Sequence, residues 1–534
     1  MSIRTERAIR SAGMGVLFMA AAGLALAEST DQAPLSAIDW LSQSVATPAA
    51  LPRGPVAQPQ AQPQAGSAAP VGLAPPPAGA ITVTPLNRQA PVALGLVSAA
   101  RSGLPPSLWG ATPSAELARL LRAERPDTLP AMRALLSALL ITELSPPTDG
   151  DPQNVLFLAR IDRLLDLGAL EPALAILELI AKPDPESFRR WFDASLLVGE
   201  EDRACRVMRA TPEIAPTFPA RIFCLARGGD WNAAALALRT GETLGTIDPE
   251  MAELLARFLD PELADGAEDL PLPDRPSPLV LRMMEAIGQP LPTLTLPVAF
   301  AQADLRSNSG WKARIEAGER LARAGAIPPN RLLGLYSEQR AAASGGVWER
   351  VKAIQALDHA LNDGDPAAIA ASLDAAWAQM VPLELEVPFA QLFGVRLSSA
   401  ALEGEAGALA FRIALLSDAY ETLANRHEPA DTAERFLIGV ARGDTTGLTP
   451  PDQLGVAIQR VFSDPEPALP PALATLLADN KLGEAVLKAI EAVTQGASGD
   501  LREVTGGLAL LRKVGLEQAA RQAALELLLL ERRG

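Results

Sequence analysis

The sequence predicts an all-α protein, built as an elongated α-solenoid of helix-turn-helix repeats in two blocks. Apolar residues recur at helical spacing almost without interruption after Ser114. Aromatic residues make up only 4% of the chain while 48% of it is hydrophobic. The core is therefore built from Ala, Leu, Val and Ile, whose small side chains suit closely stacked helices. The chain is also too long for one compact core, because single cores stop growing near ~250 to 300 residues.

The N-terminus has the layout of a cleavable secretory signal peptide. A basic stretch with Arg4, Arg7 and Arg10 precedes an apolar run of about a dozen residues, and small residues follow it. A helix that spans a bilayer needs roughly 20 residues, so a retained membrane anchor is the weaker interpretation. We expect cleavage before Glu28 and a soluble periplasmic chain without an integral membrane segment.

Charge restricts the partners that we expect. The signal segment contains three Arg and one Glu, so its removal changes the formal net charge from −16 to −18. A field of this sign argues against nucleic acid and anionic lipid as partners. A solvated acidic surface without a specific role explains the charge equally well.

A short amphipathic helix is predicted directly after the cleavage site. Four of its apolar side chains share one helical face, and a Trp lies beside that face. Three interpretations stay open: a docking peptide for a protein partner, a helix that folds back onto the chain's own scaffold, and a residual helix without a role. The candidate partner-binding residues are Leu35, Ile38, Trp40, Leu41 and Val45.

Composition divides the rest of the chain. Residues 48–80 are dominated by Pro, Gln, Ala and Gly, which cannot bury enough apolar surface to fold, and the predicted tether reaches ~100 Å if extended. The density of prolines at 266–297 stops helices. The predicted domains are 1–27, signal peptide; 28–47, docking peptide; 48–80, disordered linker; 81–113, extended segment packed on the scaffold through Leu108 and Trp109; 114–265, helical block 1; 266–297, Pro-rich junction with one short helix at 280–287; and 298–534, helical block 2.

Four junctions between predicted helices share one pattern, a turn-forming residue five positions before an Ala. The Gly or Asn accepts the left-handed conformation that ends a helix, and the Ala lets the next helix pack closely. The pairs are Gly168 with Ala173, Gly229 with Ala234, Asn480 with Ala485, and Gly515 with Ala520. Two of these stretches, LLDLGALEPA at 164–173 and LARGGDWNAA at 225–234, resemble tetratricopeptide-like α-solenoid proteins. The resemblance implies a scaffold that binds protein partners.

The chain contains two cysteines, Cys205 and Cys224, each in a predicted helix, at 202–210 and 220–226. In an oxidising compartment such a pair can close a helix-loop-helix unit. The disulfide would stabilise the fold by roughly 3 kcal/mol in the chain-entropy model. The alternative is two buried thiols that act as small hydrophobic side chains.

Residues for catalysis, metal binding or cofactor binding do not form a recognisable pattern. The only histidines, His359 and His427, have no further ligands at the spacing of a zinc site. The sequence has no Gly-x-Ser-x-Gly and no phosphate-binding loop. Ser309 and Lys312 match Ser-x-x-Lys, but the companion motifs are missing. We therefore expect no catalytic, metal or cofactor site.

Taken together, these features predict a non-catalytic periplasmic adaptor whose partners are proteins of the cell envelope, such as a protease, a peptidoglycan enzyme or a flagellar motor. One alternative is a hydrolase or lyase that acts on peptidoglycan or another envelope polymer. It requires two or more carboxylates that converge in a pocket with perturbed pKa values. A second alternative is a structural spacer between envelope layers.

Overall fold

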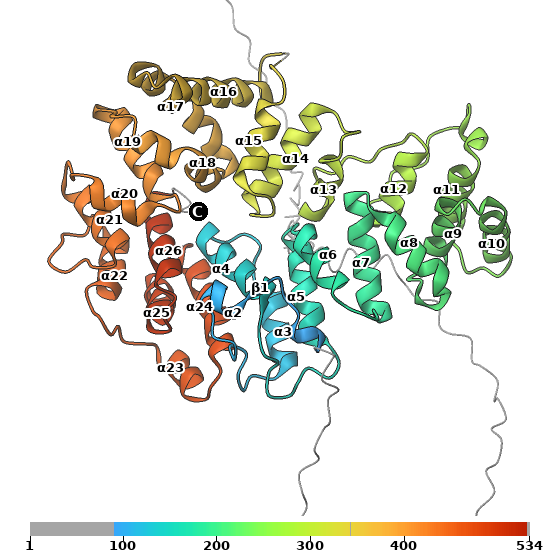
Figure 1. The fold of residues 1–534 in the computed structure, drawn as a ribbon, viewed down its shortest axis with the longest axis horizontal. Coiled ribbons are helices and arrows are strands. Elements are labelled where there is room, and N and C mark those ends of the chain that lie inside the picture. Colours follow the sequence, from blue (N-terminus) through green and yellow to red (C-terminus); the bar gives the residue numbers. More distant parts are fainter. Residues whose placement is uncertain (1–89, 342, 531–534) are drawn as a thin grey trace, which may run out of the picture. The chain divides into compact units, whose positions relative to one another are not determined.

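The computed structural model of the chain describes residues 90–341 and 343–530 (Figure 1). Within them the chain forms 25 α-helices, five short 3-10 helices and one parallel pair of two-residue strands. The strands are β1 (Val97–Ser98) and β2 (Thr142–Glu143). The predicted all-α class is confirmed.

The helices of the first half are mostly short, and many begin at a proline. The α-helices are α2 (Ala99–Ser102), α3 (Ser114–Ala123), α4 (Pro130–Ile141), α5 (Val155–Asp166), α6 (Leu170–Glu178), α7 (Pro185–Val198), α8 (Glu201–Ala210), α9 (Phe218–Arg227), α10 (Trp231–Thr243), α11 (Pro249–Leu259) and α12 (Pro278–Ala286). The 3-10 helices are η1 (Pro91–Ala93), η2 (Pro212–Ile214), η3 (Pro261–Ala264), η4 (Val298–Phe300) and, in the second half, η5 (Val381–Leu383).

The second half continues the same pattern. Its α-helices are α13 (Ala301–Asp304), α14 (Trp311–Arg323), α15 (Pro329–Ser337), α16 (Val347–Asp363), α17 (Pro366–Met380), α18 (Glu386–Ser398), α19 (Gly404–Leu415), α20 (Tyr420–Arg426), α21 (Thr432–Arg442), α22 (Gln453–Phe462), α23 (Pro471–Ala478), α24 (Leu482–Gly496), α25 (Leu501–Lys513) and α26 (Glu517–Leu529).

Side-chain caps define several helix starts. The Asp184 carboxylate accepts hydrogen bonds from the N–H groups of Glu186 and Ser187 at the start of α7. Asp248 caps α11 and Asp452 caps α22 in the same way. The first N–H groups of a helix have no intrahelical partner, so these carboxylates satisfy them and complement the positive end of the helix dipole.

The predicted turn pattern is confirmed at all four junctions. Gly168, Gly229, Asn480 and Gly515 have φ values of 74°, 83°, 57° and 85°, the left-handed conformation that ends a helix. The Ala that follows five positions later is 0% exposed in each case, so its methyl group lies in a helix contact. These residues are Ala173, Ala234, Ala485 and Ala520.

The Pro-rich stretch at 266–297 contains one short helix, α12, close to the predicted 280–287. The apolar core is not divided at this stretch. The larger core combines buried residues from 92–303 with others from 411–527, and the smaller one consists mainly of residues from 301–416. The predicted blocks are separated at 266–297, whereas the larger core takes residues from both sides of that stretch.

Helices from the two ends of the described chain pack against each other. Helix α24 contacts α3 and α4, and α26 contacts α4, so the red and blue ends lie side by side in Figure 1. The hydroxyl groups of Thr128 and Thr494 are 2.5 Å apart at this contact. In an open solenoid each repeat contacts only its neighbours. The solenoid arrangement is therefore not confirmed.

Trp109 is fully buried at this contact, as predicted for an anchor of the N-terminal segment. The N–H of Gly483, in α24, donates to the Leu108 carbonyl at 2.7 Å. A Cβ atom on Gly483 would lie 2.8 Å from the indole ring of Trp109. The close approach of the indole to the α24 backbone therefore requires glycine.

Arg160, in α5, is 1% exposed and joins the N-terminal segment to the helices. Its guanidinium donates to the carbonyls of Val92 at 2.6 Å, Leu94 at 3.0 Å, Leu140 at 2.7 Å and Thr142 at 3.1 Å. Burial lowers the pKa of Arg160 to about 10, so the group stays charged at neutral pH. Four backbone acceptors take the place of a carboxylate.

Candidate functional site

The predicted docking residues, Leu35, Ile38, Trp40, Leu41 and Val45, lie outside the described residues. The docking peptide therefore stays a prediction. The cysteine pair lies within the described residues. Cys205 is in α8 and Cys224 is in α9, and the bounds of both helices are close to the predicted ranges.

The sulfur atoms of Cys205 and Cys224 lie at disulfide-bonding distance, with their Cα atoms 4.9 Å apart. That Cα separation falls in the ordinary range for disulfides. Both side chains are almost fully buried, at 2% and 0% exposed. The position of the pair between two adjacent helices is that of a structural cross-link.

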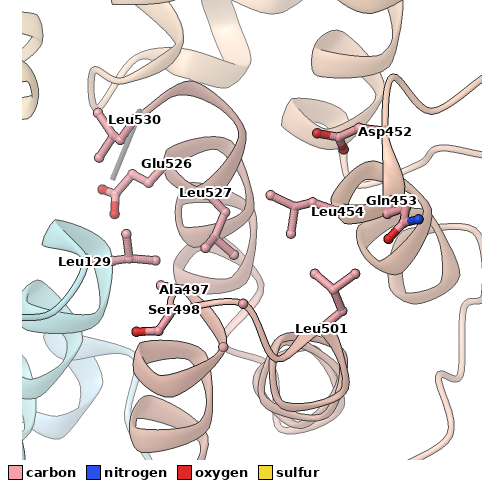
Figure 2. A pocket seen from close by; sticks show the side chains of 12 residues that line it. Leu129, Asp452, Gln453, Leu454, Ala497, Ser498, Leu501, Glu526, Leu527 and Leu530 are labelled. Atoms are coloured by element: carbon pink, nitrogen blue, oxygen red, sulfur yellow. The ribbon is translucent and has the colours of Figure 1, made fainter. Parts of the chain in front are cut away.

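One cavity, of about 370 Å³, lies where α22, α26 and the turn between α24 and α25 meet the start of α4 (Figure 2). Its walls are mainly apolar. The lining residues are Leu129, Asp452, Gln453, Leu454, Gly496, Ala497, Ser498, Gly499, Leu501, Glu526, Leu527 and Leu530.

Both carboxylates of this cavity take part in helix capping. Glu526 accepts a hydrogen bond from the Ala131 N–H at 2.9 Å, in the first turn of α4. Asp452 accepts from the Gly455 N–H at 2.7 Å, in the first turn of α22. Figure 2 shows the two side chains on different sides of the cavity. The two carboxylates therefore stabilise the starts of two helices, and they are not placed together as a catalytic acid and base.

A second cavity, of about 430 Å³, is the acidic groove, which lies between α11, the Pro-rich non-helical segment 270–274 and α12. Its lining combines eight apolar residues with four carboxylates. The apolar lining residues are Met251, Leu254, Leu270, Pro271, Leu272, Pro273, Val280 and Met284. The acidic lining residues are Asp248, Glu250, Glu253 and Asp274.

Side-chain hydrogen bonds hold the wall of the acidic groove in place. The Leu270 N–H donates to the Gln289 side-chain oxygen at 3.0 Å, and the Gln289 amide donates to Asp269 at 2.8 Å. Arg257, in α11, donates to the Glu268 carbonyl at 2.7 Å. The prolines of the segment fix its φ angles and exclude it from a helix. The groove is therefore formed before any occupant arrives.

The four carboxylates of the acidic groove differ in their partners. Asp248 accepts from the Met251 N–H at 2.8 Å as the cap of α11, and Glu253 pairs with Arg257 at 2.6 Å. Within the part of the chain that the structure describes, the carboxylates of Glu250 and Asp274 have no hydrogen bond or ion pair. The described lining contains no Lys or Arg side chain. Two solvent-exposed carboxylates therefore line the groove without an ion-pair partner in the described chain.

The carboxyl groups with strongly raised pKa values lie elsewhere. Burial raises the pKa of Glu124, at the end of α3, to about 8, although Arg163 opposes the shift. Burial likewise raises the pKa of Asp193, in α7, to about 7 against the effect of Arg189 and Arg190. Neither residue lines the cavity of Figure 2 or the acidic groove. A pair of converging, perturbed carboxylates, as a polymer-cleaving enzyme needs, is not found in these two cavities.

The two histidines have local contacts only. His427 stacks on Phe411 with ring centroids 3.6 Å apart and lies 3.0 Å from Glu434. The His359 side chain is 79% exposed beside Asp363. Over residues 90–341 and 343–530, no three His, Cys, Asp or Glu side chains are grouped as metal ligands.

Comparisons with protein-family models, with curated proteins and with solved structures found no match. In the described ranges, no helix combines the length and the apolar character needed to cross a membrane. The sequence predicts only a Pro-rich junction at 266–297 and does not by itself reveal the acidic groove there. Its signal was Leu-Pro-Leu-Pro next to acidic residues, at 268–274.

Proposed function

We propose that this protein is a non-catalytic periplasmic scaffold that binds protein partners in the cell envelope. The acidic groove is the observation that supports this proposal most. Its lining combines eight apolar side chains with four carboxylates. Recognition of a partner protein needs apolar area and a few directed polar groups, and this lining supplies both.

The sequence and the cysteine pair support a periplasmic location and a role in binding partners. The signal layout favours export, and a structural disulfide between Cys205 and Cys224 is typical of an oxidising compartment. The resemblance to tetratricopeptide-like proteins favours a binding role. The tethered segment 28–47 offers a second contact, which would raise the effective concentration of a bound partner.

Crosslinking in the periplasm followed by affinity capture tests this function. The mature chain is compared with a variant that lacks residues 28–47 and with an unrelated acidic periplasmic protein as the control. We expect a reproducible set of envelope proteins that the control does not capture. A set captured only by the intact chain assigns docking to residues 28–47. Capture no greater than that of the control would contradict the scaffold function.

A further inference from the structure

We propose that the acidic groove binds an apolar segment of a partner protein that has Lys or Arg side chains next to its apolar residues. This inference rests on the proposed scaffold function and specifies the chemistry of the partner. It follows from the shape, the lining and the charge of the groove.

The apolar lining sets the first requirement for the occupant. Leu254 and Met284 are buried in the floor, at 5% and 2% exposed, and Met251 and Val280 are half-buried on the walls. Leu272, on the rim, is 67% exposed. A cavity of about 430 Å³ lies in the size range of binding pockets, and methionine side chains adapt to partners of varied shape. An inserted apolar segment would cover Leu272 and gain from its burial.

The charges set the second requirement. The carboxylates of Glu250 and Asp274 lack counter-ions among the described residues, and no Lys or Arg lines the groove. Acidic peptides, nucleic acids and anionic lipids would place like charges beside them, which costs free energy. Both carboxylates are exposed to solvent, where a Lys or Arg side chain of a partner can pair with them. The predicted segment 28–47 contains three acidic residues and no basic one, so it does not have this chemistry.

The backbone of the rim excludes one mode of recognition. Pro271 and Pro273 have no N–H group, so the segment 270–274 offers few donors for an added β-strand. Because Gln289 and Arg257 hold the segment in place, little ordering of the groove opposes binding. Recognition therefore depends on side chains of the partner rather than on strand addition.

A direct binding measurement tests the proposal on the full mature chain. The probe is a fluorescein-labelled synthetic peptide in which Leu and Lys alternate, and fluorescence anisotropy gives its Kd. We expect Glu250→Gln combined with Asp274→Asn to raise the Kd about tenfold at low salt. Leu272→Ser, on a largely exposed side chain, raises it about fivefold without affecting folding.

Matched controls separate the groove from the general acidity of the chain. Glu213→Gln with Glu242→Gln removes two exposed carboxylates outside the groove. Leu236→Ser, in α10, removes a side chain that is 68% exposed, close to the 67% of Leu272. We expect these variants to bind the probe as the unmodified chain does. An equal loss in the control and groove variants would overturn the proposal.

Other occupants give distinct results. A probe with Glu in place of Lys that binds equally well would overturn the charge argument. Displacement of the Lys probe by a peptide of residues 28–47 would assign the groove to the chain's own N-terminal segment. A dimer in sedimentation that Leu272→Ser dissociates would assign it to a second copy. Either assignment would overturn the proposal of a basic partner segment.

Crosslinking of the groove variants distinguishes this inference from the scaffold function. Partners that the unmodified chain and the Glu250→Gln, Asp274→Asn variant capture equally would contradict the groove proposal and leave the scaffold function standing. Groove-dependent binding of the probe without any captured partner would contradict the scaffold function alone. Loss of particular partners with the groove variant, but not with Glu213→Gln and Glu242→Gln, supports both.

Discussion

The carboxylate of Glu526 accepts a hydrogen bond from the backbone N–H of Ala131 at 2.9 Å, although 395 residues separate them. The N-cap residue of α4, Leu129, has no side chain that can cap the helix. Glu526, from α26, therefore supplies the cap and places a negative charge at the positive end of the α4 dipole. Because Glu526 is 5% exposed, water does not replace this contact. The interaction fixes the last helix on one of the first.

Replacing Glu526 with Ala should lower the free energy of unfolding by about 2 kcal/mol. The change leaves a buried N–H of α4 without its acceptor and removes a charge from the helix end. Glu526→Gln keeps an acceptor oxygen and should cost less than the alanine variant. Urea unfolding followed by circular dichroism measures both effects.

Glu466→Ala is the control for this prediction, because the Glu466 side chain is 79% exposed in its ion pair with Lys513. Exposed pairs of this kind contribute little to stability, and many contribute nothing measurable. Equal effects of the two alanine variants would contradict a stabilising role for the Glu526 cap.

Arg160→Met should destabilise the N-terminal segment by about 3 kcal/mol. The variant keeps most of the side-chain volume but leaves the buried carbonyls of Val92, Leu94, Leu140 and Thr142 without their donor. Limited proteolysis should then cut within residues 90–113 faster than in the unmodified chain. Arg125→Met, at a side chain that is 57% exposed, is the control and should not change the cleavage rate.

Local rules of the sequence predicted the parts of the fold that depend on neighbouring residues. Gly168 and Ala173 lie five positions apart, and both the left-handed turn and the buried Ala follow from that short stretch. The contacts of Trp109 with Gly483 and of Glu526 with Ala131 join distant residues. No periodicity in the sequence links such pairs, so the packing between the first and last helices of the described chain could not be predicted.

The acidic groove illustrates the same limit. Its Pro-rich wall was visible in the sequence, and the prolines correctly predicted an interruption of the helices. The opposite wall comes from α11, and Glu250 and Asp274 join one site only through the packing of α11 beside segment 270–274. A Pro-rich stretch with acidic residues can be a simple interruption between helices or one wall of a binding groove. Only the arrangement of the facing side chains distinguishes the two.

Replacing Cys205 and Cys224 together with Ala should lower the stability of the oxidised protein by about 3 kcal/mol, because the cross-link restricts the unfolded chain. Part of the loss comes from the two buried sulfur atoms themselves. The comparison is therefore repeated after reduction, where only that packing loss should remain. Mass spectrometry of the unreduced chain after thiol alkylation checks the bond directly. Full alkylation of both thiols without reductant would contradict the disulfide.

The stability of the protein should fall as the pH rises from about 5 to about 8. Burial raises the pKa of Glu124 to about 8, so the folded state keeps a proton that the unfolded state releases above its ordinary pKa of 4.5. The stabilisation is fully present below the unfolded pKa and is lost as the pH rises through the folded one. The slope for one such group is at most about 1.4 kcal/mol per pH unit.

Glu124→Gln should flatten this part of the profile, because the amide has a similar volume and does not titrate. Asp193→Asn should act in the same direction up to about pH 7, the value to which burial raises the pKa of Asp193. Urea midpoints across this pH range, with exposed Glu213→Gln as the control, measure the slopes. An unchanged slope in Glu124→Gln would show that the Glu124 carboxyl is ionised in the folded protein, and that water or Arg163 offsets its burial.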